Sequence, residues 1–220
     1  MKQAIFSRAE DASEYLANHI IDKINEFNPS ALKPFVLGLP TGSSPEGVYA
    51  KLIEANRQGK FFNHIDIPRQ NIHILNGLSK DIEAECANYE AKIKSFGRIN
   101  LFMGGLGPEG HLAFNEAGSK RESRTRKVEL VKSTIKANSR FFSNDESKVP
   151  KYALSVGIST ILDNSDEIVL IVLGELKKFA LDKTIWGTKN DSNYPSLYLQ
   201  DHSNVLIVCD HSAAGLKAKL

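Results

Sequence analysis

The sequence predicts an α/β protein whose mainly parallel sheet carries helices on both faces. Three mostly apolar segments, at 34–39, 168–173 and 204–209, are typical of strands covered on both sides. Segments with helical periodicity or strong helix formers alternate with them along the chain. The 220 residues suffice to bury a core, and no repeat, low-complexity tract or proline- and glycine-rich linker interrupts them. We therefore expect a single domain over residues 1–220.

Each element follows from a local pattern. Ser7 and Glu10 have the spacing of a capping box, which predicts a helix to about Phe27. Pro45 marks the first turn of a second helix, and residues 81–96 are rich in strong helix formers. The other expected elements are strands at 71–75 and 99–103, a helix from about 150 to 162 and a helix that starts near Glu175.

Composition excludes several classes of function. The chain has 28 basic and 26 acidic residues and a net charge of +2, so no strong field favours nucleic acid. The densest basic stretch, at 120–127, is interrupted by Glu122. No apolar run is long enough to span a membrane, and the N-terminal residues lack the apolar core of a signal peptide. We expect a cytoplasmic protein.

The two cysteines give no sign of a metal site or a disulfide framework. Cys86 and Cys209 are far apart in the sequence, and Cys209 lies in an apolar segment. Metal sites built on cysteine need closely spaced ligand pairs, which this chain does not have. The sequence therefore predicts a buried thiol at Cys209 and no bound metal.

The loop after the first apolar strand has the composition of a phosphate site. Gly42 permits a tight turn, while Thr41, Ser43 and Ser44 supply hydroxyl donors next to the predicted start of a helix. Free N–H groups and a partial positive charge at a helix N-terminus suit a phosphate monoester. The alternative is an ordinary serine cap, since such helix starts are common. A nucleotide P-loop is excluded because the Gly-Lys-Ser/Thr ending is absent.

A glycine-rich loop follows the strand at 99–103. Gly105, Gly107 and Gly110 have the G-x-G-x-x-G spacing of dinucleotide-binding loops. That fingerprint requires a helix that opens across the glycines. Here Pro108 and a cluster of polar residues follow instead, without a helical apolar stripe. The spacing is therefore misleading, and no dinucleotide is expected.

The same loop carries His111 between Glu109 and Glu116. An imidazole can exchange a proton near neutral pH, and a neighbouring carboxylate fixes its tautomer and supports its charged form. A lone histidine is more often a structural residue. Four glycines, two carboxylates and Asn115 in one short loop favour a catalytic role instead. We expect His111, Glu109 and Glu116 to be catalytic.

Two isolated cations are candidates for neutralising a phosphate. Arg140 lies in the segment 137–142, and Lys177 follows the apolar strand at 168–173. A guanidinium and an ammonium from separate loops can hold one phosphoryl group. Most lysines and arginines serve solubility, so these two gain weight only from their combination with the other loops.

Together these segments resemble the glucosamine-6-phosphate deaminase (isomerase) family, in a fungal-like version. The motifs Leu-Pro-Thr-Gly at 39–42 and Gly-His-x-Ala-Phe-Asn-Glu at 110–116 are highly specific when both occur in this order. Further matching segments are 35–42, 71–77, 123–126, 137–142 and 149–154.

The resemblance implies a Rossmann-like fold of the deaminase and phosphogluconolactonase type. It implies conversion of glucosamine 6-phosphate and water to fructose 6-phosphate and ammonia, in N-acetylglucosamine catabolism, without a cofactor. It gives His111 the proton transfer that opens the sugar ring, with Glu116 and Glu109 assisting. It implies phosphate binding by Thr41, Gly42, Ser43, Ser44, Arg140 and Lys177. The expected partner is a small amino-sugar phosphate, and homo-oligomer formation stays open.

The chain departs from the family pattern in three places. Glu109 stands where the family usually has aspartate, and Lys120 and Val128 only partly match the allosteric site of bacterial members. After Lys60 the family continues through a strand with a Phe-Asn-Met-Asp-Glu-Tyr motif and then a helix, which this chain lacks. That motif contains the aspartate that removes a proton from the second carbon. We therefore expect weak binding of the sugar phosphate and severely reduced turnover.

Two alternatives remain. A 6-phosphogluconolactonase shares the fold and a similar Gly-His loop, but its loop does not continue as Phe114-Asn115-Glu116. A non-catalytic sugar-phosphate binder is consistent with the missing base. Binding without turnover would distinguish the binder from the enzyme.

Overall fold

The computed structural model describes residues 1–59, 67–188, 191 and 193–216. Its strands are β1 (Lys2–Phe6), β2 (Leu37–Gly38), β3 (Leu101–Gly105), β4 (Arg126–Glu129), β5 (Tyr152–Ser155), β6 (Ile168–Val172) and β7 (Val205–Asp210). Its α-helices are α1 (Ala9–Phe27), α2 (Glu46–Arg57), α3 (Ile82–Ser95), α4 (Lys132–Asn138), α5 (Ile158–Asn164) and α6 (Lys178–Trp186). Its 3₁₀ turns are η1 (Arg69–Asn71), η2 (Ser139–Phe142), η3 (Glu146–Lys148), η4 (Glu175–Lys177) and η5 (Pro195–Asp201).

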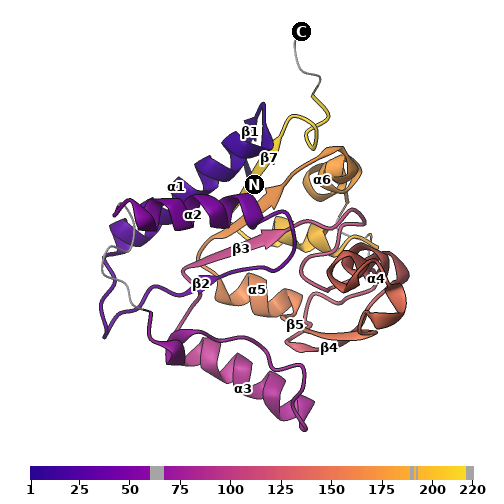
Figure 1. Ribbon diagram of the computed structural model, residues 1–220, viewed down its shortest axis with the longest axis horizontal. Coiled ribbons are helices and arrows are strands. Elements are labelled where there is room, and N and C mark those ends of the chain that lie inside the picture. The colour runs from indigo at the N-terminus through magenta and orange to yellow at the C-terminus, as the bar shows by residue number, and fades with distance from the viewer. Residues whose placement is uncertain (60–66, 189–190, 192, 217–220) are drawn as a thin grey trace.

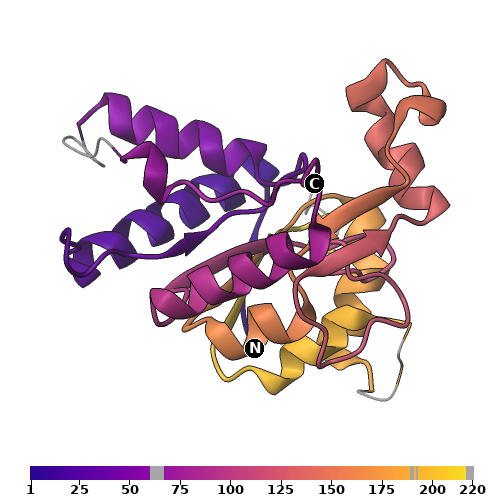
Figure 2. The ribbon, with the colours of Figure 1, turned by 90° about the horizontal axis from the view of Figure 1, so that it is seen from below.

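Five of the strands form one parallel sheet in the order β1-β7-β6-β3-β2 (Figure 1). Helices cover both of its faces, so the predicted fold class is confirmed. The two remaining strands, β4 and β5, pair antiparallel beside it. Figure 2 shows α1 and α2 on one side of the sheet and α3 and α5 on the other.

The core alternates along the strands because successive side chains point to opposite faces. Leu101, Val169 and Val208 pack with α1 and α2, whereas Phe102, Leu170 and Ile207 pack with the helices of the other face. Every side chain of β6 is fully buried. A central strand covered on both faces needs such a continuous apolar run, which is why β6 and β7 could be predicted.

The two edge strands were predicted less well. The expected strand at 34–39 shrinks to β2, whose residues are only half-buried because β2 has a neighbour on one side within the described residues. The N-terminal strand β1 was not predicted, since most of its side chains are exposed. The capping box at Ser7 is also wrong, because Arg8 precedes the helix and no side-chain hydrogen bond caps it.

Two other expectations need correction. Residues 71–75 form no strand: η1 ends at Asn71, and the following chain leaves Ile72 57% and Ile74 82% exposed. The helix expected from about 150 begins only at Ile158, and β5 precedes it. Both errors come from reading short segments without knowing their neighbours in the sheet.

The helices at 81–96 and after Pro45 were predicted correctly. The carboxylate of Asp81 accepts a hydrogen bond from the N–H of Ala84 and caps α3. Helix α2 begins at Glu46, directly after Pro45. The junction at 60–61, where the sequence predicts the loss of a strand and a helix, lies outside the described residues.

Candidate active site

The candidate loops lie at one edge of the sheet. Strands β2, β3 and β6 are parallel neighbours, so the loops that follow them leave the sheet at the same edge. These loops carry Thr41–Ser44, Glu109–Glu116 and Lys177 respectively. In open α/β sheets ligands bind outside the carboxyl ends of the strands. The topology therefore places the predicted groups where such a site is expected.

The loop after β3 turns tightly around its glycines. Gly107 donates from its N–H to the carbonyl of His111 at 3.0 Å, and Gly110 adopts a φ of +77°, which favours glycine. A Cβ built on Gly107 would lie 2.2 Å from Nε2 of His111, so the imidazole packs against bare backbone. No helix opens across these glycines, as the sequence predicted.

Asn115 anchors the loop from inside. Its side chain is fully buried, and its Nδ2 donates to the carbonyls of Leu112 and Val156 at 2.8 Å each. Its Oδ1 accepts from the guanidinium of Arg126 at 2.7 Å. The first bond closes the loop on itself, and the other two tie it to the segment before α5 and to β4. Asn115 thus fixes the direction of the next residue, Glu116.

Glu116 lies beside the histidine. One carboxylate oxygen, Oε2, is 3.0 Å from Nδ1 of His111, and the other accepts a 2.6 Å hydrogen bond from the hydroxyl of Thr134. Burial alone would raise the pKa of Glu116, but the contacts with His111 and Thr134 outweigh it and lower that pKa. Glu116 is therefore held as a carboxylate next to the imidazole.

The contact between His111 and Glu116 is close but imperfectly aligned. Nδ1 is buried, and its N–H is not directed at any acceptor among the described residues. Catalytic hydrogen bonds are often loose in a free enzyme and align when the ligand is bound. The misalignment is therefore compatible with a catalytic pair.

Glu109 lies further out on the same loop. Its Oε2 accepts a 2.9 Å hydrogen bond from Ser133, which precedes Thr134 on α4. Glu109 and Glu116 both line a pocket of about 300 Å³, together with Phe179 and Tyr194. The two carboxylates that the sequence singled out thus face one cavity.

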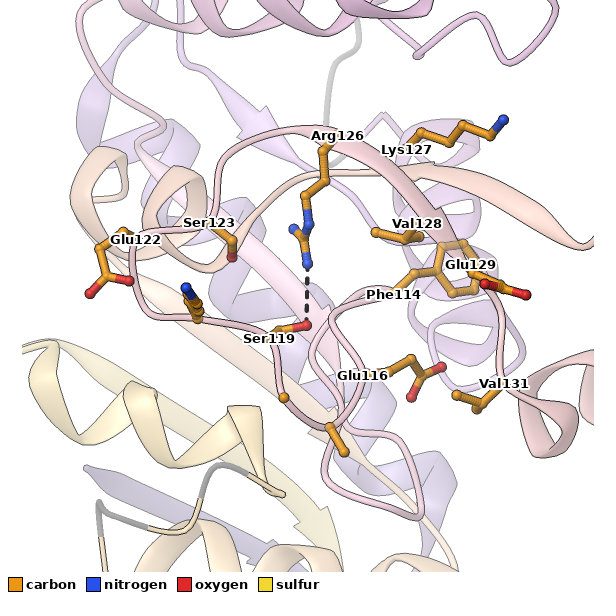
Figure 3. A pocket seen from close by; sticks show the side chains of 13 residues that line it. Phe114, Glu116, Ser119, Glu122, Ser123, Arg126, Lys127, Val128, Glu129 and Val131 are labelled. Carbon is orange, nitrogen blue, oxygen red and sulfur yellow. Dashed lines mark hydrogen bonds between the residues drawn. The ribbon is translucent and has the colours of Figure 1, made fainter.

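A second pocket, of about 590 Å³, is also lined by Glu116 (Figure 3). Arg126 projects into it from β4, and its guanidinium donates to Ser119 at 3.2 Å. Arg126 has no carboxylate partner among the described residues, and burial lowers its pKa. The sequence singled out no role for this arginine.

Lys177 and Arg140 come close to each other without an acidic partner in the described part of the chain. Burial, and after it the charge of Arg140, lower the pKa of Lys177 to about 8. Arg140 lies over the ring of Phe141, 4.7 Å from its centroid. Two cations held together without an anion form a ready site for one.

The hydroxyl groups after β2 are also available. Thr41, Ser43 and Ser44 have no side-chain hydrogen-bond partner among the residues that the structure describes. Gly42 has a φ of +104° and makes the turn. The residue that precedes α2 is Pro45, so none of the three hydroxyls serves as the helix cap that was the alternative interpretation.

Sequence reasoning missed the residues that hold the carboxylates. Ser133, Thr134 and Arg126 lie in a polar stretch without an apolar pattern that would place it in the fold. Nothing in the sequence indicates that α4 packs on the histidine loop. The described residues contain no group of three or more histidines, cysteines, aspartates or glutamates able to hold a metal, and no described helix is long and apolar enough to cross a membrane.

The chain is similar to proteins of one family. Residues 56–208 match the family model described as glucosamine-6-phosphate isomerases/6-phosphogluconolactonase. The chain is 68% identical to a glucosamine-6-phosphate isomerase of Candida albicans, with both chains covered completely. It is 46% identical to a glucosamine-6-phosphate deaminase of Phocaeicola vulgatus, covering 97% of this chain and 92% of the relative.

The alignment with the Candida protein also reveals a difference in length. It runs over 252 positions and covers all 220 residues of this chain, so 32 of its positions have no residue here.

Solved structures agree with the fold. A monomeric glucosamine-6-phosphate deaminase superposes with a TM-score of 0.89 at 33% identity, covering 99% of this chain and all of that one. A 6-phosphogluconolactonase from Trypanosoma brucei superposes with a TM-score of 0.69 at 17% identity, covering 97% of each chain, which shows a shared fold alone. Family match, relatives and fold agree, and the chain belongs to the glucosamine-6-phosphate isomerase/6-phosphogluconolactonase family.

Proposed function

We propose that this protein is a glucosamine-6-phosphate deaminase, which converts glucosamine 6-phosphate and water to fructose 6-phosphate and ammonia. One observation carries the proposal: the pair His111–Glu116 lies at the sheet edge that also carries Lys177, a cation without an acidic partner among the described residues. A phosphate held by Lys177, Arg140 and the loop 41–44 directs the sugar ring toward the imidazole. The names of the most similar relatives support the same activity.

In this proposal His111 moves the proton that opens the ring. The imidazole takes the proton of the hydroxyl at the first carbon and returns one to the ring oxygen, so the ring C–O bond breaks and a carbonyl forms. Glu116 balances the positive charge that His111 carries between the two transfers. Glu109, which faces the same cavity, assists from the rim. None of these steps requires a cofactor.

We propose further that turnover is impaired. The resemblance puts the enolising aspartate in a segment absent after Lys60, and the alignment with the Candida protein has positions without a residue in this chain, as such a deletion requires. Loss of a positioned general base typically costs about 10²–10⁴-fold in rate.

The experiment combines two measurements on the purified chain. Calorimetry measures binding of glucosamine 6-phosphate, and a coupled assay measures release of ammonia. We expect binding with turnover at least about 10²-fold below that of the Candida relative. Turnover equal to that of the relative would contradict the impairment. Absence of both binding and turnover would contradict the function itself.

Two other functions are tested by the same samples. A non-catalytic sugar-phosphate binder would bind without any ammonia release. A 6-phosphogluconolactonase would hydrolyse the lactone, but the lactonases among the solved structures are only distant in sequence, at 17% identity for the Trypanosoma brucei protein. Cytoplasmic localisation remains a prediction, and the homo-oligomer question stays open.

A further inference from the structure

Helix α4 attaches to the histidine loop through two neighbouring hydroxyl groups. Ser133 donates to Oε2 of Glu109 at 2.9 Å, and Thr134 donates to Oε1 of Glu116 at 2.6 Å. Both predicted catalytic carboxylates are therefore bonded to consecutive residues of one helix. The second bond is deeply buried, since Thr134 is 5% and Glu116 9% exposed.

The same helical segment leads to the cation pair. Helix α4 continues without a break into η2, which contains Arg140. Asn138 Nδ2 donates to the carbonyl of Thr134 at 2.8 Å, which stiffens the stretch between them. Six residues of helix span about 9 Å, so Thr134 and Arg140 move together as parts of one short rod.

This rod packs little on the central sheet. Among the helices and strands of the described chain, its main contact outside α4 and η2 is with the turn η3. Figure 2 shows the segment that contains α4, η2 and η3 projecting from the body of the molecule. Its side-chain bonds to Glu109 and Glu116 are thus important attachments, and a displacement of the rod acts on those carboxylates.

We propose that Ser133 and Thr134 are positioning residues that hold Glu109 and Glu116, and that an anion bound at Arg140 and Lys177 acts on Glu116 through α4. The second part rests on the proposed phosphate site. The geometry at His111 indicates what a movement of α4 would change in the site. Nδ1 is 3.0 Å from Oε2 of Glu116 but has no aligned acceptor in the described part of the chain, and Thr134 holds the opposite oxygen of that carboxylate. A shift of α4 turns the carboxylate and aligns this contact.

The test measures the pKa of Glu116 from the ¹³C NMR signal of its carboxyl carbon, in protein labelled with ¹³C at its glutamates. The variant Glu116→Gln assigns the signal. Among the described residues, the other charged groups around Glu116 are His111 on its own loop and Glu109 in the smaller pocket. The larger pocket adds Lys120, Glu122, Arg126, Lys127 and Glu129. None of them changes in the variants compared.

Thr134→Val removes the donor while keeping the shape of the side chain, and Thr134→Ser keeps the donor. Because the hydroxyl stabilises the carboxylate, we expect the pKa of Glu116 to rise in Thr134→Val and to stay unchanged in Thr134→Ser. Ser133→Ala is the matched control, since it frees Glu109 and leaves Glu116 bonded. An unchanged titration in folded Thr134→Val overturns the positioning role.

Inorganic phosphate then tests the link to the cation pair. We expect phosphate to move the Glu116 signal in the unchanged chain and in Thr134→Ser, and to leave it in place in Thr134→Val. An equal response in Thr134→Val would mean that the anion acts directly through space, which overturns the link. Calorimetry on the unchanged chain is run in parallel. If it detects no phosphate binding, the proposed phosphate site is wrong, and the pKa titration of Glu116 still decides the role of Thr134.

Discussion

Arg126 donates a 2.7 Å hydrogen bond to Oδ1 of Asn115, a side chain with no exposed surface. The bond joins β4 to the histidine loop and completes the three hydrogen bonds of this amide. We predict that Asn115→Leu destabilises the fold by roughly 2–4 kcal/mol, because it removes three hydrogen bonds of a fully buried side chain at once. Urea denaturation measures this loss. Asn18→Ala, on the exposed side of α1, serves as the control with a change near zero.

The packing of His111 on Gly107 leads to a second prediction. A methyl group at position 107 overlaps the imidazole, so Gly107→Ala must displace the ring. We expect a changed His111 resonance and about 10²-fold less ammonia release than in the unchanged chain, because small misplacements of a catalytic group are costly. Gly105→Ala is the matched control, since its Cβ meets no atom within 4 Å. Equal spectra and rates for the two variants would contradict this role of Gly107.

The pKa of Lys177, about 8, predicts how phosphate binding depends on pH. Lys177 carries its charge below that value, whereas a phosphate monoester gains its second charge above about pH 6. Affinity for the sugar phosphate should therefore be highest between these limits and fall by about tenfold per pH unit well above pH 8. Calorimetry at a series of pH values measures the decline. The variant Lys177→Arg should bind the sugar phosphate without this decline above pH 8, because arginine stays protonated.

Acid stability should depend on a carboxylate outside the active site. Glu90 on α3 accepts hydrogen bonds from the N–H and hydroxyl of Thr125 and from the hydroxyl of Thr160. Burial alone would raise the pKa of Glu90, but these bonds and the charge of Arg124 lower it. The stability that Glu90 contributes is thus complete above the unfolded carboxyl pKa of about 4.3, and it is lost as the pH falls through the lower folded value.

We predict that Glu90→Gln lowers the urea midpoint at pH 7 and weakens its decline below about pH 4. The glutamine amide can replace the carboxylate in shape but not in charge. Glu83→Gln, on an exposed side of the same helix, is the control and should keep the acid decline of the unchanged chain. If the urea midpoint of Glu90→Gln fell below pH 4 as steeply as that of the control, Glu90 would not be the source of the acid sensitivity.

The parts of the fold that could be predicted are those where local pattern and neighbours agree. β6 and β7 are buried on both faces, so an unbroken apolar run identifies them. The run at 71–75 looks similar, but no strand lies beside it in the described chain, and it stays irregular. Whether such a segment forms a strand depends on its register and on the strands beside it, and a single sequence does not show either of these.

The histidine site could likewise be predicted only where its contacts are local in the sequence. His111 and Glu116 are five residues apart in a glycine-rich loop, and the structure brings them to 3.0 Å. Thr134 reaches the same carboxylate from α4, across a turn and a strand that the sequence did not reveal. Contacts within a loop follow from spacing, whereas a hydroxyl that comes from a separate helix requires the tertiary structure. The catalytic and phosphate-binding roles of these residues remain predictions.

The short strand β2 has a consequence for how the protein behaves at high concentration. Its outer backbone groups face no strand within the described residues, and Ile72 and Ile74 lie exposed in the segment after η1. An unprotected edge of this kind is a template on which an extended segment of another molecule can add. Association that grows with concentration is expected to start at this strand edge.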